Sequence, residues 1–234
     1  MISGLQKMTL LDFPGKVACT AFLQGCNYRC PFCHNSDLLP GKGEELMTTE
    51  ELIAFLRKRQ GLLDGVCVSG GEPTLCPELP ELLKAIKSLG FAVKLDTNGS
   101  RPQILKELVT EGLVDYVAMD VKNSPQRYAE TVGLPHFDLG PTVESLRSLI
   151  GGTVDYELRT TVVKPLHDEA AIQDMGVWLG SLVPGKKPRR LFLQKFVDRE
   201  SVLFAGLSPA LPEEMQRLSE LLEKHCEQVS VRGE

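Results

Sequence analysis

The sequence lacks a long hydrophobic run. No stretch of about 18 consecutive apolar residues occurs, so a membrane-spanning helix is not expected. The opening segment, MISGLQKMTLLDFPGK, has neither the apolar core nor the small-residue cleavage site of a secretory signal. We therefore expect a cytoplasmic protein with no membrane partner.

An excess of charge of one sign is also missing. The 26 basic and 31 acidic residues give a net charge of −5 at pH 7, which creates no field that would gather nucleic acid or anionic lipid over a whole face. The basic cluster PGKKPRR, at residues 184–190, is more typical of a solvated loop than of a phosphate site. The composition therefore predicts no nucleic-acid partner.

Linkers, repeats and low-complexity segments are absent as well. The chain has 234 residues, of which 42% are hydrophobic and 24% are charged, and these values are ordinary for a globular protein. No segment rich in proline, glycine and serine divides the chain. We therefore expect a single domain over residues 1–234.

Short β-branched runs alternate along the chain with longer amphipathic stretches. Strands are predicted over 16–23, 65–70, 92–97, 116–121, 156–163 and 190–196, with a further short one at 228–232. Helices are predicted from a Thr48 N-cap with Glu51 as its capping-box partner, and then over 78–89, 102–111, 142–150, 169–182 and 211–226. Such alternation predicts an α/β protein with a parallel sheet. Six strand–helix units make a partial (β/α)6 TIM-like barrel, two units short of a closed one.

Three of the seven cysteines stand within eight residues, in the stretch FLQGCNYRCPFCHN. Cys26, Cys30 and Cys33 have no second close-spaced pair elsewhere, whereas a structural zinc site closes with four ligands. His34 directly follows Cys33 and would point away from a site that Cys33 faces. A [4Fe–4S] cluster held by three thiolates keeps one iron open for a substrate or cofactor. The other cysteines are expected to be inert, either in apolar strands (Cys19, Cys67), in a loop (Cys76) or near a helix end (Cys226).

Polar residues gather where the predicted strands end. The segments concerned are SGGEP at 69–73, DTNG at 96–99 and MDVK at 119–122, together with Arg159 and Gln194. Chemistry in parallel α/β folds lies beyond the carboxyl ends of the strands. These residues are therefore predicted to share one site with the cysteine loop.

The triplet CNYRCPFC, followed in order by SGGEP and DTNG, resembles the signature of the radical S-adenosylmethionine superfamily. The resemblance covers nearly the whole chain and implies the same partial barrel. It implies that Cys26, Cys30 and Cys33 hold three irons of a [4Fe–4S] cluster, with S-adenosylmethionine on the fourth.

The resemblance also implies roles for the polar residues. Phe32 would pack on the adenine, and the peptide groups around His34 would reach the edge of that ring. Gly70 and Gly71 would let the backbone approach the methionine ammonium, and Glu72 would accept a hydrogen bond from it. A monovalent cation would be surrounded by Asp96, Thr97 and Asp120, and the cofactor carboxylate would be neutralised by Lys122 and Arg159. The alternatives are strand-end caps for the aspartates, a simple turn for DTNG and salt bridges to Asp96 or Asp120 for the two basic residues.

Within the superfamily, LDFPGKVACTAFLQGCNYRCPFCHN is similar to the opening of anaerobic ribonucleoside-triphosphate reductase activating proteins, and DTNG with MDVK is similar to pyruvate formate-lyase activating enzymes. This resemblance implies an activating enzyme that takes a hydrogen atom from a glycine of a glycyl-radical enzyme. The partner it implies first is an anaerobic ribonucleotide reductase, and the electron donor would be a flavodoxin- or ferredoxin-type protein. The segment FLQKF lacks the histidine found near that place in the formate-lyase group. A small-molecule enzyme of the 7-carboxy-7-deazaguanine synthase type and a non-catalytic metal or electron-transfer module are the alternatives.

Overall fold

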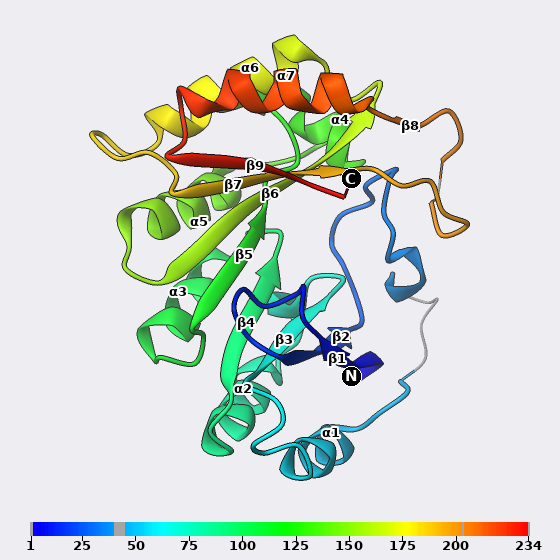
Figure 1. Ribbon diagram of the computed structural model, residues 1–234, viewed down its shortest axis with the longest axis vertical. Helices are drawn as coiled ribbons and strands as arrows, with labels where there is room; N and C mark the ends of the chain where they lie inside the picture. The colour runs from blue at the N-terminus through cyan, green and yellow to red at the C-terminus, as the bar shows by residue number, and fades with distance from the viewer. Residues whose placement is uncertain (1, 40–44, 203, 234) are drawn as a thin grey trace. The chain divides into compact units, whose positions relative to one another are not determined.

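The computed structural model describes residues 2–39, 45–202 and 204–233 (Figure 1). The chain folds into two compact units. The first comprises Met1–Asn27 and Asp37–Ala118, and the second comprises Tyr28–Ser36 and Met119–Glu234. The organisation as a single domain therefore stays a prediction. Within the described ranges, every helix is too short or too polar to cross a membrane.

The first unit contains five strands in spatial order of their numbers. They are β1 (Ile2–Thr9), β2 (Ala18–Leu23), β3 (Gly65–Gly70), β4 (Ala92–Thr97) and the start of β5 (Tyr116–Asp120). The pairs β2–β3 and β3–β4 are parallel, whereas β1 pairs with β2 in the antiparallel sense. The sequence did not predict β1, because its serine, glycine and exposed polar residues do not form the buried β-branched run that marks the other strands.

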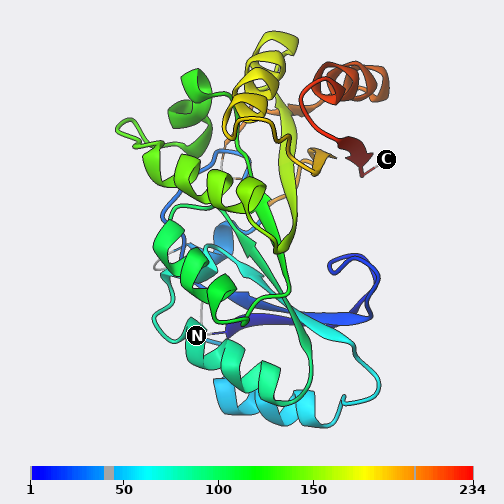
Figure 2. The same ribbon diagram turned by 90° about the vertical axis from the view of Figure 1, so that its left-hand side faces the viewer.

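Three helices connect these strands: α1 (Thr49–Arg57), α2 (Leu79–Ser88) and α3 (Pro102–Thr110). In both views α1 and α2 lie side by side (Figures 1 and 2). The predicted capping box at α1 is confirmed, since Glu51 N donates to Thr48 Oγ1 and Thr48 N donates to the Glu51 carboxylate. Helix α2 ends close to the predicted limit of residue 89, and the next residue, Gly90, has a φ of 87° that favours glycine.

The second unit contains the end of β5, β6 (Asp155–Lys164), β7 (Arg190–Lys195) and β9 (Gln228–Arg232), in that order. The pairs β6–β7 and β7–β9 are parallel, and the two-residue strand β8 (Ser208–Pro209) lies antiparallel to the end of β6. The helices are α4 (Tyr128–Val132), α5 (Gly140–Gly151), α6 (Glu169–Ser181) and α7 (Pro212–Glu223). Helices α6 and α7 lie side by side over β7 and β9 (Figure 1).

The α/β class and the six successive strand–helix units are confirmed. A mostly parallel sheet begins at β1 and ends at β9 without closing on itself. The limits of the predicted elements agree closely with the structure, whereas the antiparallel strand β1 and the short elements β8 and α4 were not predicted. The carboxyl ends of the parallel strands within each unit carry the polar segments described below.

The last strand is fixed by an ion pair that reaches into the core. Glu157 on β6 is 1% exposed, and both of its oxygens accept from the Arg232 guanidinium, at 3.0 and 2.9 Å. The same guanidinium lies over the Phe192 ring of β7. A buried carboxylate with a two-point arginine contact depends strongly on that partner.

We expect Arg232→Met to lower the free energy of unfolding by about 3 kcal/mol, because it removes the cation that balances a buried carboxylate. Urea denaturation measures the difference. Arg217→Met is the matched control, since Arg217 pairs with Glu169 on the surface and such pairs contribute less than about 1 kcal/mol. Equal losses in the two variants would contradict this account.

Candidate active site

The cysteine loop belongs partly to each unit. Cys26 lies in the first, whereas Cys30 and Cys33 lie in the second, where Cys33 N donates to Cys30 O at 3.2 Å in a tight turn. None of the seven cysteines, all of which are described, forms a disulfide. Within residues 2–39, 45–202 and 204–233, no three His, Cys, Asp or Glu side chains converge as the ligands of one metal ion would.

The cysteines predicted to be inert are buried or partly buried. Cys19 and Cys67 are fully buried in β2 and β3, and Cys226 is 3% exposed. Burial raises the pKa of Cys19 to about 11 and that of Cys226 to about 12, so both thiols stay protonated at neutral pH. The expectation that Cys19 and Cys67 are small core residues is confirmed.

Two glycines at the end of β3 let the main chain of β2 and the cysteine loop come close. A side chain on Gly70, whose φ is 127°, would lie 2.2 Å from Leu23 O, and one on Gly71 would lie 2.1 Å from Gly25 O. The amides of Gly71 and Glu72 donate to Leu23 O and Gly25 O. The glycines therefore hold SGGEP against the chain that leads into Cys26, whereas their approach to a methionine ammonium stays a prediction.

Glu72 ties the SGGEP segment to the DTNG segment. Its carboxylate is fully buried and accepts from the amide and hydroxyl of Thr74, from the Thr97 hydroxyl at 2.7 Å and from Asn98 N at 2.5 Å. Burial raises the pKa of Glu72, and the four donors oppose this shift. Four donors around one carboxylate favour a structural role, so the predicted contact of Glu72 with the methionine ammonium remains untested.

Asn98, which sequence reasoning did not single out, connects DTNG with the cysteine loop. Its Nδ2 donates to Asn27 Oδ1 at 2.9 Å and lies 4.0 Å from Cys26 Sγ. Asn27 Nδ2 in turn donates to Ser100 Oγ at 2.9 Å. The first unit therefore brings together three segments that were predicted to share a site, those around Cys26, Glu72 and Thr97.

Asp96 has a basic partner that the sequence analysis also missed. Lys94, two residues earlier on β4 and 1% exposed, pairs with Asp96 Oδ1 at 2.5 Å, and Ser69 Oγ donates to Oδ2 at 3.0 Å. Residues two apart on a strand project from the same face, so the VKLD alternation was the available signal. The buried ammonium balances the charge of this carboxylate.

Asp120, Lys122 and Arg159 form a cluster in the second unit. Arg159 Nε donates to Asp120 Oδ1 at 3.0 Å, and Lys122 Nζ donates to Oδ2 at 2.8 Å. Although burial favours the neutral amine, the negative charges of Asp120 and of the Cys30 thiolate raise the pKa of Lys122. The salt-bridge alternative is therefore what the structure shows for both basic residues.

Phe32 and His34 are both packed within the second unit. Phe32 is 5% exposed and meets the edge of His167, with ring centroids 6.3 Å apart. His34 stacks on Phe196, and its Nε2 donates to Val197 O at 2.7 Å. The packing of Phe32 on an adenine and the adenine contact near His34 stay predictions.

His167 links the loop after β6 to the Asp120 cluster and was not predicted. It is 3% exposed, its Nε2 donates to Lys122 O at 2.7 Å, and its Nδ1 accepts from Val163 N at 3.2 Å. Burial lowers the pKa of His167, which agrees with a neutral ring that donates through Nε2 and accepts through Nδ1.

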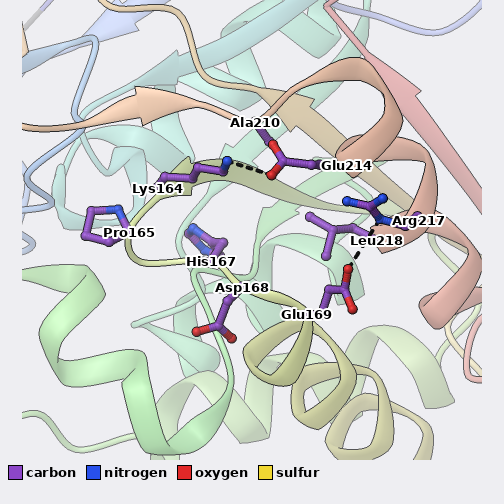
Figure 3. Close-up of a pocket in the computed structure, with 9 residues that line it drawn as sticks. All are labelled: Lys164, Pro165, His167, Asp168, Glu169, Ala210, Glu214, Arg217 and Leu218. Atoms are coloured by element: carbon purple, nitrogen blue, oxygen red, sulfur yellow. Dashed lines mark hydrogen bonds and ion pairs between the residues drawn. The ribbon is translucent and has the colours of Figure 1, made fainter.

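A cavity of about 410 Å³ lies on the other side of His167, between the loop after β6 and the start of α7 (Figure 3). Four of its charged side chains form pairs: Lys164 Nζ pairs with Glu214 at 2.6 Å, and Arg217 pairs with Glu169 at 3.3 Å. Pro165, Ala210 and Leu218 supply apolar wall. None of the residues predicted from the sequence lines this cavity, whereas His167, which binds Lys122 O, does.

Comparisons with known proteins agree with this geometry. The family model of the Radical SAM superfamily matches residues 20–172, a span that includes the cysteine loop, SGGEP, DTNG and the Asp120 cluster. The chain belongs to the radical SAM superfamily. Its cofactors are those of the family, a [4Fe–4S] cluster and S-adenosylmethionine, and it is an enzyme.

Relatives that match nearly the whole length of this radical SAM enzyme are named as activating enzymes. A Methanocaldococcus jannaschii protein, provisionally named as a glycyl-radical enzyme activating enzyme, is 31% identical over 99% of this chain and 95% of its own. Pyruvate formate-lyase 1-activating enzyme of Escherichia coli K12 is 28% identical over 97% of both chains.

Solved structures show the same fold. A domain of the pyruvate-formate lyase-activating enzyme from Bacteroides vulgatus aligns with a TM-score of 0.59 and 21% identity, over 72% of this chain and 99% of that one. SuiB of Streptococcus suis aligns with a TM-score of 0.69 and 13% identity, over 92% and 48% of the respective chains. The predicted partial-barrel fold of the radical SAM chain is therefore confirmed.

We expect Glu72→Gln to lower the free energy of unfolding of the cofactor-free protein by about 2 kcal/mol, because the amide places a donor against one of the four donors around Glu72. Chemical denaturation measures this change. Glu78→Gln is the control at an exposed carboxylate of the same stretch. An unchanged apoprotein stability with weaker S-adenosylmethionine binding would instead assign Glu72 to the cofactor.

Proposed function

We propose that the chain activates a glycyl-radical enzyme by generating a radical on a glycine of that partner. The observation that carries this proposal is the similarity to activating enzymes over 97% and 99% of the chain. The match to the superfamily alone is compatible with other radical reactions. The two activating enzymes, in contrast, align with nearly the whole length of this chain. The partner we favour is an anaerobic ribonucleotide reductase, because of the opening segment LDFPGKVACTAFLQGC.

Cys26, Cys30 and Cys33 would hold the [4Fe–4S] cluster. When bound, the cluster and S-adenosylmethionine supply a 5′-deoxyadenosyl radical through one-electron cleavage of a carbon–sulfur bond. The donor set fits such a group: three thiols stand in the CxxxCxxC spacing, Asn98 Nδ2 lies 4.0 Å from Cys26 Sγ, and the negative charge of Cys30 contributes to the raised pKa of Lys122. A cation and an amide donor beside thiolates stabilise their negative charge.

Other residues of the candidate site would bind and orient S-adenosylmethionine. The Phe32 ring would pack on the adenine, and the peptide groups near His34 would contact the edge of the adenine. Gly70 and Gly71, which have no side chains, would let the main chain approach the methionine part of the cofactor. The hydrogen bond from the Thr97 hydroxyl to Glu72 holds the segment that carries Gly70 and Gly71. A flavodoxin- or ferredoxin-type protein would deliver the electron.

The three cysteines of the triplet are expected to be indispensable. Replacing Cys26, Cys30 or Cys33 by Ala leaves two thiolates for the cluster and should reduce 5′-deoxyadenosine formation to background. Cys67→Ala, at a buried core thiol, is the control and should retain the activity. The measurement is anaerobic reconstitution followed by chromatography of the products. Turnover in any triplet variant would disprove this ligand assignment.

The partner proposal is tested by mixing the reduced, reconstituted enzyme with candidate glycyl-radical enzymes under anaerobic conditions. Electron paramagnetic resonance should then report a glycyl radical on an anaerobic ribonucleotide reductase. Replacing the partner's radical glycine by alanine should abolish the signal. A radical on pyruvate formate-lyase instead would retain the activase function but change the partner, whereas turnover of a small molecule with no protein partner would refute the activase function.

The dependence of turnover on the alkali ion tests whether Asp96 and Asp120 bind a monovalent cation. Lys94 balances Asp96, and Lys122 and Arg159 balance Asp120, so turnover is expected to be equal in sodium and potassium at constant ionic strength. Lys122→Met weakens that balance and should make turnover more sensitive to the choice of ion. If the wild type already depends on potassium, and Asp120→Asn reduces that dependence, a monovalent cation occupies the site after all.

A further inference from the structure

Helix α4 and the turn after it hold the middle of the cysteine loop through main-chain contacts. Arg29 N donates to Val132 O at 2.8 Å. Gly133, the residue that ends α4, has a φ of 68° and faces the Arg29 carbonyl so closely that a Cβ atom would lie 2.2 Å from Arg29 O. A side chain at this position has no space unless the carbonyl moves.

The neighbouring residue of the loop is held by side chains from the same segment. The Tyr28 hydroxyl lies 3.4 Å from Thr142 Oγ1, and both residues are buried. The Tyr28 ring meets Phe137 edge-on at 5.5 Å, and Phe137 stacks on Tyr128 of α4 at 5.2 Å. Residues 128–142 therefore hold Tyr28 and Arg29 from several sides, and we call this segment the clamp.

The clamp itself is anchored in the core of the second unit. Thr131 is fully buried, its hydroxyl donates to Arg127 O at 2.7 Å, and Asn123 Nδ2 donates to that hydroxyl at 2.9 Å. These buried contacts oppose a displacement of α4. An added side chain at Gly133 would therefore push the loop.

The Arg29 carbonyl belongs to the peptide group that joins Arg29 to Cys30. Because a peptide group is planar, displacing its oxygen also moves the nitrogen and Cα of Cys30. We infer that Gly133 is a positioning residue for Cys30: its missing side chain lets the clamp set the place of one cluster ligand. This inference rests on the proposed cluster site and adds a residue to it.

Gly112 provides a closely matched control. It also follows a helix, α3, its φ is likewise 68°, and nothing lies within 4 Å of the position that its Cβ would take. Alanine at either position pays the same cost of a left-handed backbone. Only alanine at Gly133 meets Arg29 O.

We expect Gly133→Ala to retain the reconstituted cluster about 10-fold less well than the wild type, as changes around metal ligands typically do. Gly112→Ala should retain it fully. The measurements are iron and sulfide per chain during challenge with an iron chelator, with melting temperature and circular dichroism to confirm that both variants fold.

A second measurement uses the cofactor-free protein and so does not depend on cluster assembly. The rate of alkylation of Cys30, read by mass spectrometry, should rise in Gly133→Ala and stay at the wild-type value in Gly112→Ala. Full cluster retention in Gly133→Ala, or equal losses in the two variants, would overturn the inference. A wild-type chain that takes up no cluster would instead overturn the proposed function on which it rests.

Discussion

The candidate site depends on one constraint: the short cysteine loop is held by its main chain. Gly71 packs against Gly25 O just before Cys26, and Gly133 packs against Arg29 O just before Cys30. Both contacts require a residue without a side chain, and both lie within a few bonds of a cysteine. Main-chain contacts of this kind fix the path of a loop while leaving its thiols available to a metal group.

Charges around the loop are balanced within each unit. Glu72 is surrounded by four donors, Asp96 has Lys94, and Asp120 has Lys122 and Arg159. Carboxylates that are buried without such partners would be protonated or would weaken the fold. Lys122 and Arg159 bind one oxygen each of Asp120, so this carboxylate is neutralised within the second unit.

Much of the fold followed from the sequence because buried parallel strands and amphipathic helices have distinct periods. GVCVSG is a continuous buried run and AVKLDT carries buried apolar residues at Val93 and Leu95, and their limits agree with β3 and β4. The edge strand β1 and the five-residue helix α4 were missed, since neither contains enough residues of one pattern to reveal a period. Tertiary contacts, to β2 and to the cysteine loop, determine their structure instead.

In the candidate site, the order of the motifs predicted which segments lie together, but it did not predict which side chains contact one another. Thr97 and Glu72 were expected to face a cofactor, yet they bind each other, and the two basic residues predicted for the cofactor carboxylate both bind Asp120. A motif records which residue types are needed, whereas the direction of each side chain depends on neighbours from distant parts of the sequence. Gly133 illustrates the limit: a glycine after a short helix reads as an ordinary helix end, and only its distance to Arg29 O separates it from Gly112. Positions that act through close main-chain packing therefore become visible only once the fold is known.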